Sequence, residues 1–179
     1  MTGRIDWIWA DDGDAVPPDD RGLSYGQGVF ETMRLGRGGI VLEQYHRDRL
    51  LLGCNNLDIP FDSGDLDRWR SAAEKRGLFG APGADRFLKV TVTAGSGGRG
   101  YRSPGIPCPR VITATAPLPP TPSAGDPVRV RSCEQRVQTR TDLQGLKTLE
   151  RLDQVLASME LASSEFEGVM TGPRGYPLE

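Results

Sequence analysis

A glycine-punctuated loop that runs directly into a strand organises the first half of the chain. It reads Asp20-Arg21-Gly22-Leu23-Ser24-Tyr25-Gly26-Gln27-Gly28-Val29-Phe30-Glu31-Thr32-Met33-Arg34-Leu35. Glycine adopts the backbone angles of tight turns, so we expect an irregular loop up to about residue 28. The residues after this loop favour an extended strand, and Gly36 to Gly39 should turn the chain back into a second strand over residues 40–42.

The segments around this loop predict a small domain of sheet and helices that ends near residue 116. Apolar residues recur at helical spacing in two segments, and β-branched residues alternate with period two in a third. The predicted elements are strands over residues 4–9, 87–93 and 110–114, and helices from Gln44 onward and over residues 65–77.

A proline-rich stretch separates this domain, residues 1–116, from the C-terminal third of the chain. Five prolines fall within residues 116–127, which can continue neither a helix nor a central strand, so we place an interdomain linker at 117–127. Residues 128–179 predict a strand at 128–131, a helix over 149–163 and a hairpin over 168–178. These 52 residues are few for a domain of their own. We therefore expect the start of a larger domain that is incomplete in this chain, or one completed by a partner chain.

Composition excludes several classes of function. The 22 basic and 24 acidic side chains give a net charge of −2, which does not suit nucleic-acid binding. Three cysteines without a Cys-x-x-Cys spacing, and a single histidine, predict neither a metal site nor a disulfide framework. Because no run of 18 apolar residues occurs, we expect a cytoplasmic, reduced protein without a membrane anchor.

Gly95-Ser96-Gly97-Gly98-Arg99-Gly100 has the spacing of a dinucleotide-binding loop, but its context differs. That motif needs a helix to open at its last glycine, whereas prolines occur here at positions 104, 107 and 109. A flexible loop that brings Arg99 and Tyr101 to a ligand is the better interpretation, since arginine can bind a carboxylate through two parallel hydrogen bonds. A turn with an exposed arginine is the alternative.

The chain contains 19 arginines and only three lysines, of which one stands out. Lys75 lies in a charged helix end and Lys89 on the polar face of a strand, so both should be exposed. Lys147 lies between apolar neighbours before a periodic segment, where an amine could project into a cleft and act in Schiff-base chemistry. A lysine that extends from a half-buried loop to solvent is the alternative.

His46 and Arg49 lie three residues apart on one face of the first predicted helix. A permanently charged, planar guanidinium suits a phosphate group. From these local residues alone, a solvated arginine and a surface histidine are the favoured interpretation.

Several segments taken together carry a resemblance to a known family. They are Asp20-Arg21-Gly22 with residues 25–32, His46-x-x-Arg49-Leu50, Leu88–Thr93, Leu146-Lys147-x-Leu149-x-Arg151-Leu152, and Glu167-Gly168 leading to Gly175-x-x-x-Glu179. The chain resembles the pyridoxal-phosphate enzymes of fold type IV, the group of branched-chain and D-amino acid aminotransferases and 4-amino-4-deoxychorismate lyase. The resemblance implies an α+β fold of two domains, the second larger and barrel-like, with pyridoxal 5′-phosphate as cofactor, a small-molecule substrate and a homodimer for an intact protein.

The resemblance also implies roles for individual residues. Lys147 would hold the cofactor covalently and act as the base, Arg49 would bind its phosphate, and Glu179 would face the pyridine nitrogen. Arg99 and Tyr101, together with Arg34, would hold the carboxylates of the substrate.

Two segments, residues 95–101 and 145–156, resemble the lyase branch most. That branch converts 4-amino-4-deoxychorismate into 4-aminobenzoate and pyruvate for folate synthesis. Gln27 and Glu150 depart from many relatives, which have aspartate and asparagine there. An aminotransferase on the same scaffold and a truncated, non-catalytic chain therefore remain alternatives.

Overall fold

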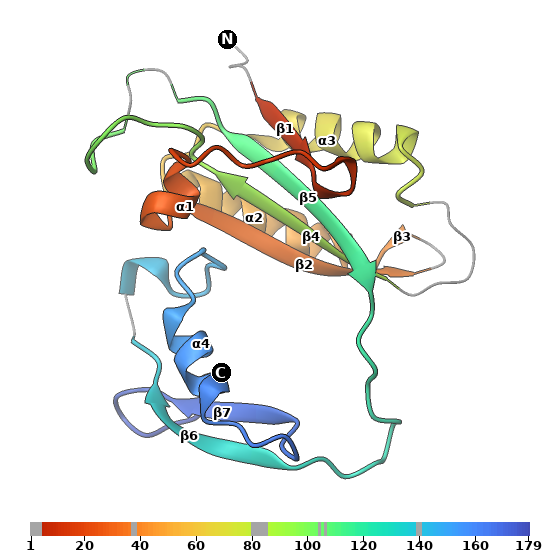
Figure 1. Cartoon of the computed structure of the whole chain (residues 1–179), viewed down its shortest axis with the longest axis vertical. Coiled ribbons are helices and arrows are strands. Elements are labelled where there is room, and N and C mark those ends of the chain that lie inside the picture. Colours follow the sequence, from red (N-terminus) through yellow and green to blue (C-terminus); the bar gives the residue numbers. More distant parts are fainter. Residues whose placement is uncertain (1–4, 37–38, 80–85, 104, 106, 139–140) are drawn as a thin grey trace. The chain divides into compact units, whose positions relative to one another are not determined.

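A five-stranded sheet is the centre of the N-terminal part of this computed structural model, which describes residues 5–36, 39–79, 86–103, 105, 107–138 and 141–179. The strands are β1 (Asp6–Trp9), β2 (Gly28–Gly36), β3 (Gly39–Ile40), β4 (Arg86–Thr93) and β5 (Arg110–Pro117). Their order is β1-β5-β4-β2-β3 (Figure 1). β1 runs parallel to β5, and the other pairs are antiparallel.

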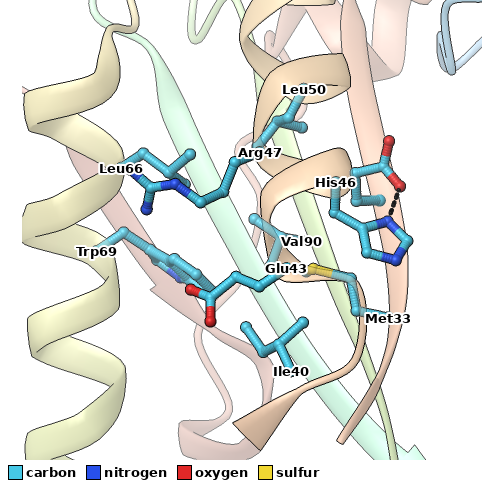
Figure 2. A pocket seen from close by; sticks show the side chains of 10 residues that line it. Met33, Ile40, Glu43, His46, Arg47, Leu50, Leu66, Trp69 and Val90 are labelled. Atoms are coloured by element: carbon cyan, nitrogen blue, oxygen red, sulfur yellow. Dashed lines mark hydrogen bonds and ion pairs between the residues drawn. The ribbon is translucent and has the colours of Figure 1, made fainter.

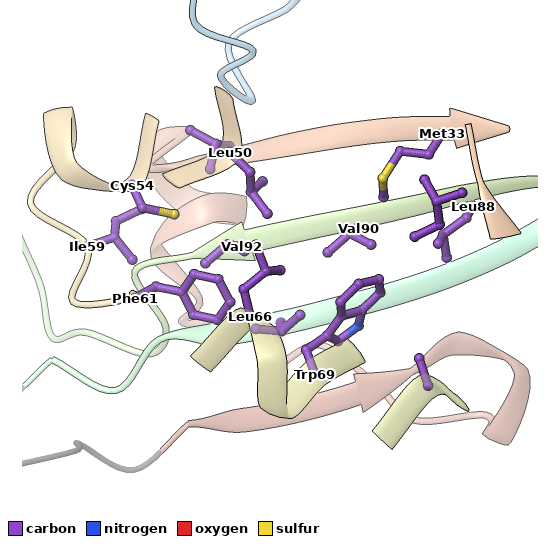
Figure 3. Close-up of a cluster of buried hydrophobic side chains, with 14 of the residues drawn as sticks. Met33, Leu50, Cys54, Ile59, Phe61, Leu66, Trp69, Leu88, Val90 and Val92 are labelled. Carbon is purple, nitrogen blue, oxygen red and sulfur yellow. The ribbon is translucent and has the colours of Figure 1, made fainter. Parts of the chain in front are cut away.

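Two helices, α2 (Glu43–Asn56) and α3 (Ser63–Lys75), cover one face of this sheet (Figure 1). Side chains of β2 alternate between the two faces of the sheet, so Val29, Met33 and Leu35 point into the core. Figure 3 shows this core, in which Leu50 and Cys54 of α2 and Leu66 and Trp69 of α3 lie against Leu88, Val90 and Val92 of β4. The Trp69 indole N–H donates to Thr113 Oγ1 at 3.0 Å, which satisfies its one polar atom.

Aspartates start two of the helices. Asp62 and Asp65 form a capping box at the N-terminus of α3, each side chain accepting from the backbone N–H of the other. Asp20 accepts from the N–H groups of Gly22 and Leu23 and so begins α1 (Arg21–Tyr25). This short helix lies inside the segment where the sequence predicts only a loop, because a side-chain cap stabilises one turn where glycine alone would not.

By contacts the chain divides into two units, Met1–Leu118 with Leu146–Leu149 and Pro119–Gly145 with Glu150–Glu179. The first unit thus includes a short piece of the later chain. Phe30 N donates to Lys147 O at 2.9 Å and Leu149 N donates to Gly28 O at 3.0 Å, so residues 146–149 run antiparallel to the start of β2. The two predicted domains and the linker at 117–127 stay a prediction.

The second unit is built on a β-α-β arrangement. β6 (Val130–Arg136) and β7 (Glu167–Thr171) pair in parallel, and α4 (Leu152–Met159) packs on them through Ala157, Cys133 and Met170. Short 3-10 turns occupy Ala10–Asp12 in the first unit and Thr141–Leu143 in the second.

Most predicted elements are confirmed, with one difference in the second unit; residue 4 of the first predicted strand and residues 37–38 of the predicted turn lie outside the described residues. The predicted helix over residues 149–163 is helical only over Leu152–Met159, because residues 146–149 are extended beside β2, where Thr148 pairs with Val29. The predicted hairpin over 168–178 is confirmed: the chain turns at Gly172–Gly175 and returns antiparallel to β7, with Gly172 N donating to Tyr176 O at 2.9 Å and Leu178 N to Met170 O at 3.0 Å.

Gly28 permits the close approach of residues 146–149 to β2. A Cβ atom there would lie 2.6 Å from Leu149 Cδ1 and 2.8 Å from the carbonyl oxygen of Val92. Because the second neighbour is backbone, it cannot move away cheaply.

We therefore expect Gly28→Ala to lower the free energy of unfolding by about 1–3 kcal/mol, the usual range for overpacking. Urea unfolding followed by tryptophan fluorescence measures this loss. Gly98→Ala is the matched control, since a Cβ atom at Gly98 meets nothing within 4 Å. Equal stability of the two variants would contradict the close approach.

Candidate active site

Lys147 is held beside β2 and reaches the ring of Phe30. Its Nζ lies 5.1 Å from the centre of that ring, and the residue is half-buried. The hydrogen bond from Phe30 N to Lys147 O fixes the backbone from which this side chain extends. Backbone pairing with β2 therefore sets the position of the Lys147 amine. β2 is the strand that begins within the family motif of residues 25–32.

A second lysine contacts the same aromatic ring. Lys89 Nζ lies 4.8 Å from the centre of Phe30, and Lys89 is exposed, as its place on the polar face of β4 predicts. Each such contact between an ammonium group and an aromatic face contributes about 0.5–1 kcal/mol at exposed sites. The two amines give the Phe30 side of the sheet a positive charge.

Arg49 lies on the helix-covered side of β2, where it binds Glu31. Arg49 Nε donates to Glu31 Oε1 at 2.5 Å and Nη2 donates to Oε2 at 2.6 Å, while His46 Nδ1 lies 2.7 Å from Oε2 (Figure 2, dashed line). The Glu31 carboxylate is fully buried. Its hydrogen bond raises the pKa of the Arg49 guanidinium, which therefore stays charged.

The exposed part of Arg49 can serve a second partner. The pair with Glu31 uses two of the five N–H donors of the guanidinium, and 41% of the side chain is exposed. Such an arrangement fits an anion with several acceptor oxygens, because Glu31 holds one edge of the guanidinium in place. The local interpretation of a simply solvated arginine is therefore wrong.

A cavity beside this cluster is too small to be a substrate site. Its volume is about 10 Å³, room for about one water molecule, and apolar side chains from β2, β3, β4, α2 and α3 line most of it (Figure 2). The lining residues are Glu31, Met33, Ile40, Glu43, His46, Arg47, Leu50, Leu66, Trp69 and Val90.

Residues 95–101 form a loop that is hydrogen-bonded to residues 19–25, the segment that contains α1. Arg99 and Tyr101 are both exposed at the end of this loop, and the ring of Tyr101 meets Tyr25 edge to face at 5.4 Å. Arg34 is exposed on the same face of β2 as Phe30. Among the described residues directly after Gly100 no helix begins.

Glu179 belongs to the second unit, in which it has two partners of its own. Gln154 Nε2 donates to Glu179 Oε2 at 2.6 Å, and Arg151 Nη1 lies 3.6 Å from Oε1. The six predicted site residues are thus distributed over both units, with only Glu179 in the second.

Three further classes of site find no support in the structure. Among the described residues no group of three His, Cys, Asp or Glu side chains comes together for a metal ion, and no helix there is long and apolar enough to span a membrane. Burial raises the pKa of the Cys54 thiol to about 12, so it is a core side chain and not a nucleophile.

The whole of this arrangement from β2 onward corresponds to one known family. The family model described as amino-transferase class IV matches residues 28–179. The chain belongs to the class IV aminotransferase family. Its fold is accordingly the mixed α+β fold of fold type IV, as the sequence predicts.

Among the relatives of this class IV aminotransferase-family chain are lyases. It is 30% identical over 158 residues to an aminodeoxychorismate lyase of Vibrio harveyi, covering 87% of this chain and 56% of that protein. It is 36% identical to the solved 4-amino-4-deoxychorismate lyase of Pseudomonas aeruginosa, with a TM-score of 0.82 and a coverage of 93% of this chain and 60% of that one.

A branched-chain aminotransferase of Thermoproteus uzoniensis shares the fold. Its TM-score is 0.72 at 19% identity, and the match covers 94% of this chain and 58% of that one. The chain thus spans less than two thirds of the length of these relatives.

Two residues of the site were missed by the sequence analysis. Glu31 occupies an inward-facing position between Val29 and Met33, and a buried carboxylate requires a cationic partner; that alternation was the available signal. Arg21 is the other: its buried side chain donates to the carbonyl groups of Gly100 and Tyr101, beside Arg99, and nothing in its sequence context indicates this burial.

We expect Glu31→Gln to lower the free energy of unfolding by about 1–3 kcal/mol, because the donors of Arg49 and His46 lose a charged acceptor. Equilibrium unfolding in urea measures the loss.

Asp67→Asn is the matched control. It weakens an exposed ion pair with Arg47, which lies on α2 like Arg49 and His46, and the loss in free energy of unfolding should be no more than about 1 kcal/mol. Losses of equal size in the two variants would mean that the Glu31 pair behaves like a surface pair.

Proposed function

We propose that this chain is the part of a pyridoxal 5′-phosphate-dependent lyase that converts 4-amino-4-deoxychorismate into 4-aminobenzoate and pyruvate. The observation that carries the proposal is the placement of the Lys147 amine beside β2, with Arg49 on the other side of the same strand. The identities of 30% and 36% to aminodeoxychorismate lyases support the choice of substrate.

The described residues fit the cofactor. An amine is needed to bind its aldehyde, and Lys147 offers one on a fixed backbone. A guanidinium with N–H groups still available can bind a phosphate group. Arg49 offers such N–H groups, because its pair with Glu31 uses only Nε and one Nη2 donor. Glu179 offers a carboxylate, the type of group that pairs with a protonated pyridine nitrogen.

The bound cofactor supplies a conjugated ring that takes up the electrons released when a C–H bond next to nitrogen breaks. Lys147 Nζ would remove that proton as the general base. Loss of the proton and cleavage of the ring C–O bond to the pyruvyl ether would leave an aromatic ring, and the released enolate would take up one proton on its methylene carbon to become pyruvate.

The substrate is a dicarboxylate, and the residues proposed to bind it are cationic or polar. Arg99 and Tyr101 extend from an exposed loop, and Arg34 lies on the Phe30 side of β2. A guanidinium binds a carboxylate through two parallel hydrogen bonds, which fixes its orientation as well as its charge. An aminotransferase would use the same lysine to return the proton to the cofactor, so the lysine does not distinguish the two reactions.

Lys147→Ala is expected to abolish covalent binding of pyridoxal 5′-phosphate. Borohydride reduction of the mixture followed by mass spectrometry of the intact chain measures the covalent adduct.

Lys89→Ala is the matched control, because this lysine contacts the same ring of Phe30; its adduct should form as in the wild type. An adduct that persists in Lys147→Ala would contradict the proposed role of Lys147. An adduct that never forms with the wild-type chain would favour a non-catalytic chain.

Arg99→Met should raise the KM for 4-amino-4-deoxychorismate at least tenfold and change kcat much less, since a charged bidentate contact to the substrate is lost. Release of pyruvate and 4-aminobenzoate provides the assay, and amino transfer to a keto acid is followed in parallel. Arg102→Met, three residues along the same exposed segment, controls for the loss of loop charge. Amino transfer without pyruvate release would identify an aminotransferase instead.

A further inference from the structure

Arg21 is a buried cation whose donors are directed at the loop over residues 95–101. Only 3% of the residue is exposed. Its Nη1 donates to the carbonyl of Gly100 at 3.1 Å and its Nη2 to the carbonyl of Tyr101 at 2.8 Å, while Nε donates to Gln27 Oε1 at 2.6 Å. All three acceptors are neutral, so the buried charge is stabilised by hydrogen bonds at the end of the loop.

The rest of the loop is bound to the same segment of chain. Ser96 Oγ donates to Asp19 Oδ1 at 3.0 Å, and Gly97 N donates to Asp19 O at 3.3 Å. Gly100 N donates to Tyr25 Oη at 3.1 Å. The loop is thus attached at both ends, and Arg21 and Tyr25 hold the end that carries Arg99 and Tyr101.

The geometry of this contact requires a guanidinium. Two adjacent carbonyl groups and a side-chain oxygen are reached by three nitrogens of one planar fork, and the ring of Tyr25 lies 4.9 Å from the guanidinium carbon. An ammonium group is a single donor atom that can keep the charge but not all three directions.

We propose that Arg21 is a positioning residue for substrate recognition. By holding the carbonyl groups of Gly100 and Tyr101, it fixes the backbone from which Arg99 and Tyr101 extend, so that both side chains stand ready for a carboxylate. The gain is preorganisation, because a loop that is already ordered loses less conformational entropy when the substrate binds. This inference rests on the proposed function, in which Arg99 and Tyr101 bind the substrate.

Arg21→Lys in the full chain tests the proposal, because it keeps the charge and most of the stem. Trypsin cleavage after Arg99 under native conditions measures opening of the loop. We expect this cleavage to be about tenfold faster in the variant, the change that corresponds to the loss of one net hydrogen bond. Cleavage after Arg76, at the exposed end of α3, should keep its wild-type rate.

Two cleavage results would overturn the proposal. A wild-type rate after Arg99 would mean that Arg21 does not hold the loop. A rise after Arg99 and Arg76 together would mean that the substitution only weakens the fold. If Arg21→Lys does not fold, Tyr25→Phe, which removes the acceptor for Gly100 N, keeps the test available.

The kinetic readout separates positioning from structural support. Arg21→Lys should raise the KM for 4-amino-4-deoxychorismate about tenfold with kcat within threefold of the wild type, and a fall in kcat at constant KM would contradict positioning. If wild type and Arg99→Met share the same KM, Arg99 does not bind the substrate, and if the wild type releases no pyruvate from 4-amino-4-deoxychorismate, the proposed function is wrong. In both cases the cleavage rates still decide whether Arg21 holds the loop.

Discussion

Two backbone hydrogen bonds between the start of β2 and residues 146–149 are the constraint on which the candidate site depends. They join Phe30 N to Lys147 O and Leu149 N to Gly28 O, residues more than 100 positions apart along the chain. Backbone pairing of this kind sets register as well as distance, since a shift by one residue would turn the lysine to the other face. The Lys147 amine therefore keeps its place beside Phe30 through the backbone that carries it.

The alternation of β2 then distributes the chemistry over two sides of one strand. Phe30 faces the two lysines, and its neighbour Glu31 faces Arg49 and His46 on the helix-covered side. Successive side chains of a strand point to opposite faces, so an amine and a guanidinium can be held by adjacent residues without repelling each other at contact distance. Glu31 adds the opposite charge that lets a cation lie beside an apolar core.

Local patterns in the sequence predicted the elements whose stability is local. Period two over residues 87–93 and helical spacing after Gln44 correspond to β4 and α2. The helix expected from Leu149 begins only at Leu152, because pairing with β2, about 120 residues away in sequence, holds residues 146–149 in an extended conformation. The sequence likewise identified Arg49 as a candidate anion-binding residue but not its pair with Glu31, because the buried Glu31 lies on β2 and Arg49 on α2.

Gln27 explains how the chain accommodates a departure from the aspartate found in many relatives at this position. Its Oε1 accepts from Arg21 Nε, and its Nε2 donates to the carbonyl of Leu57 at 3.2 Å. One amide thus links Arg21 to the residue directly after α2. Aspartate could accept from Arg21 but has no N–H for Leu57. Gln27 therefore bridges two parts of the first unit through its side-chain amide. The charge of Arg21 is then directed at the carbonyl groups of the loop, where it fixes residues 100 and 101.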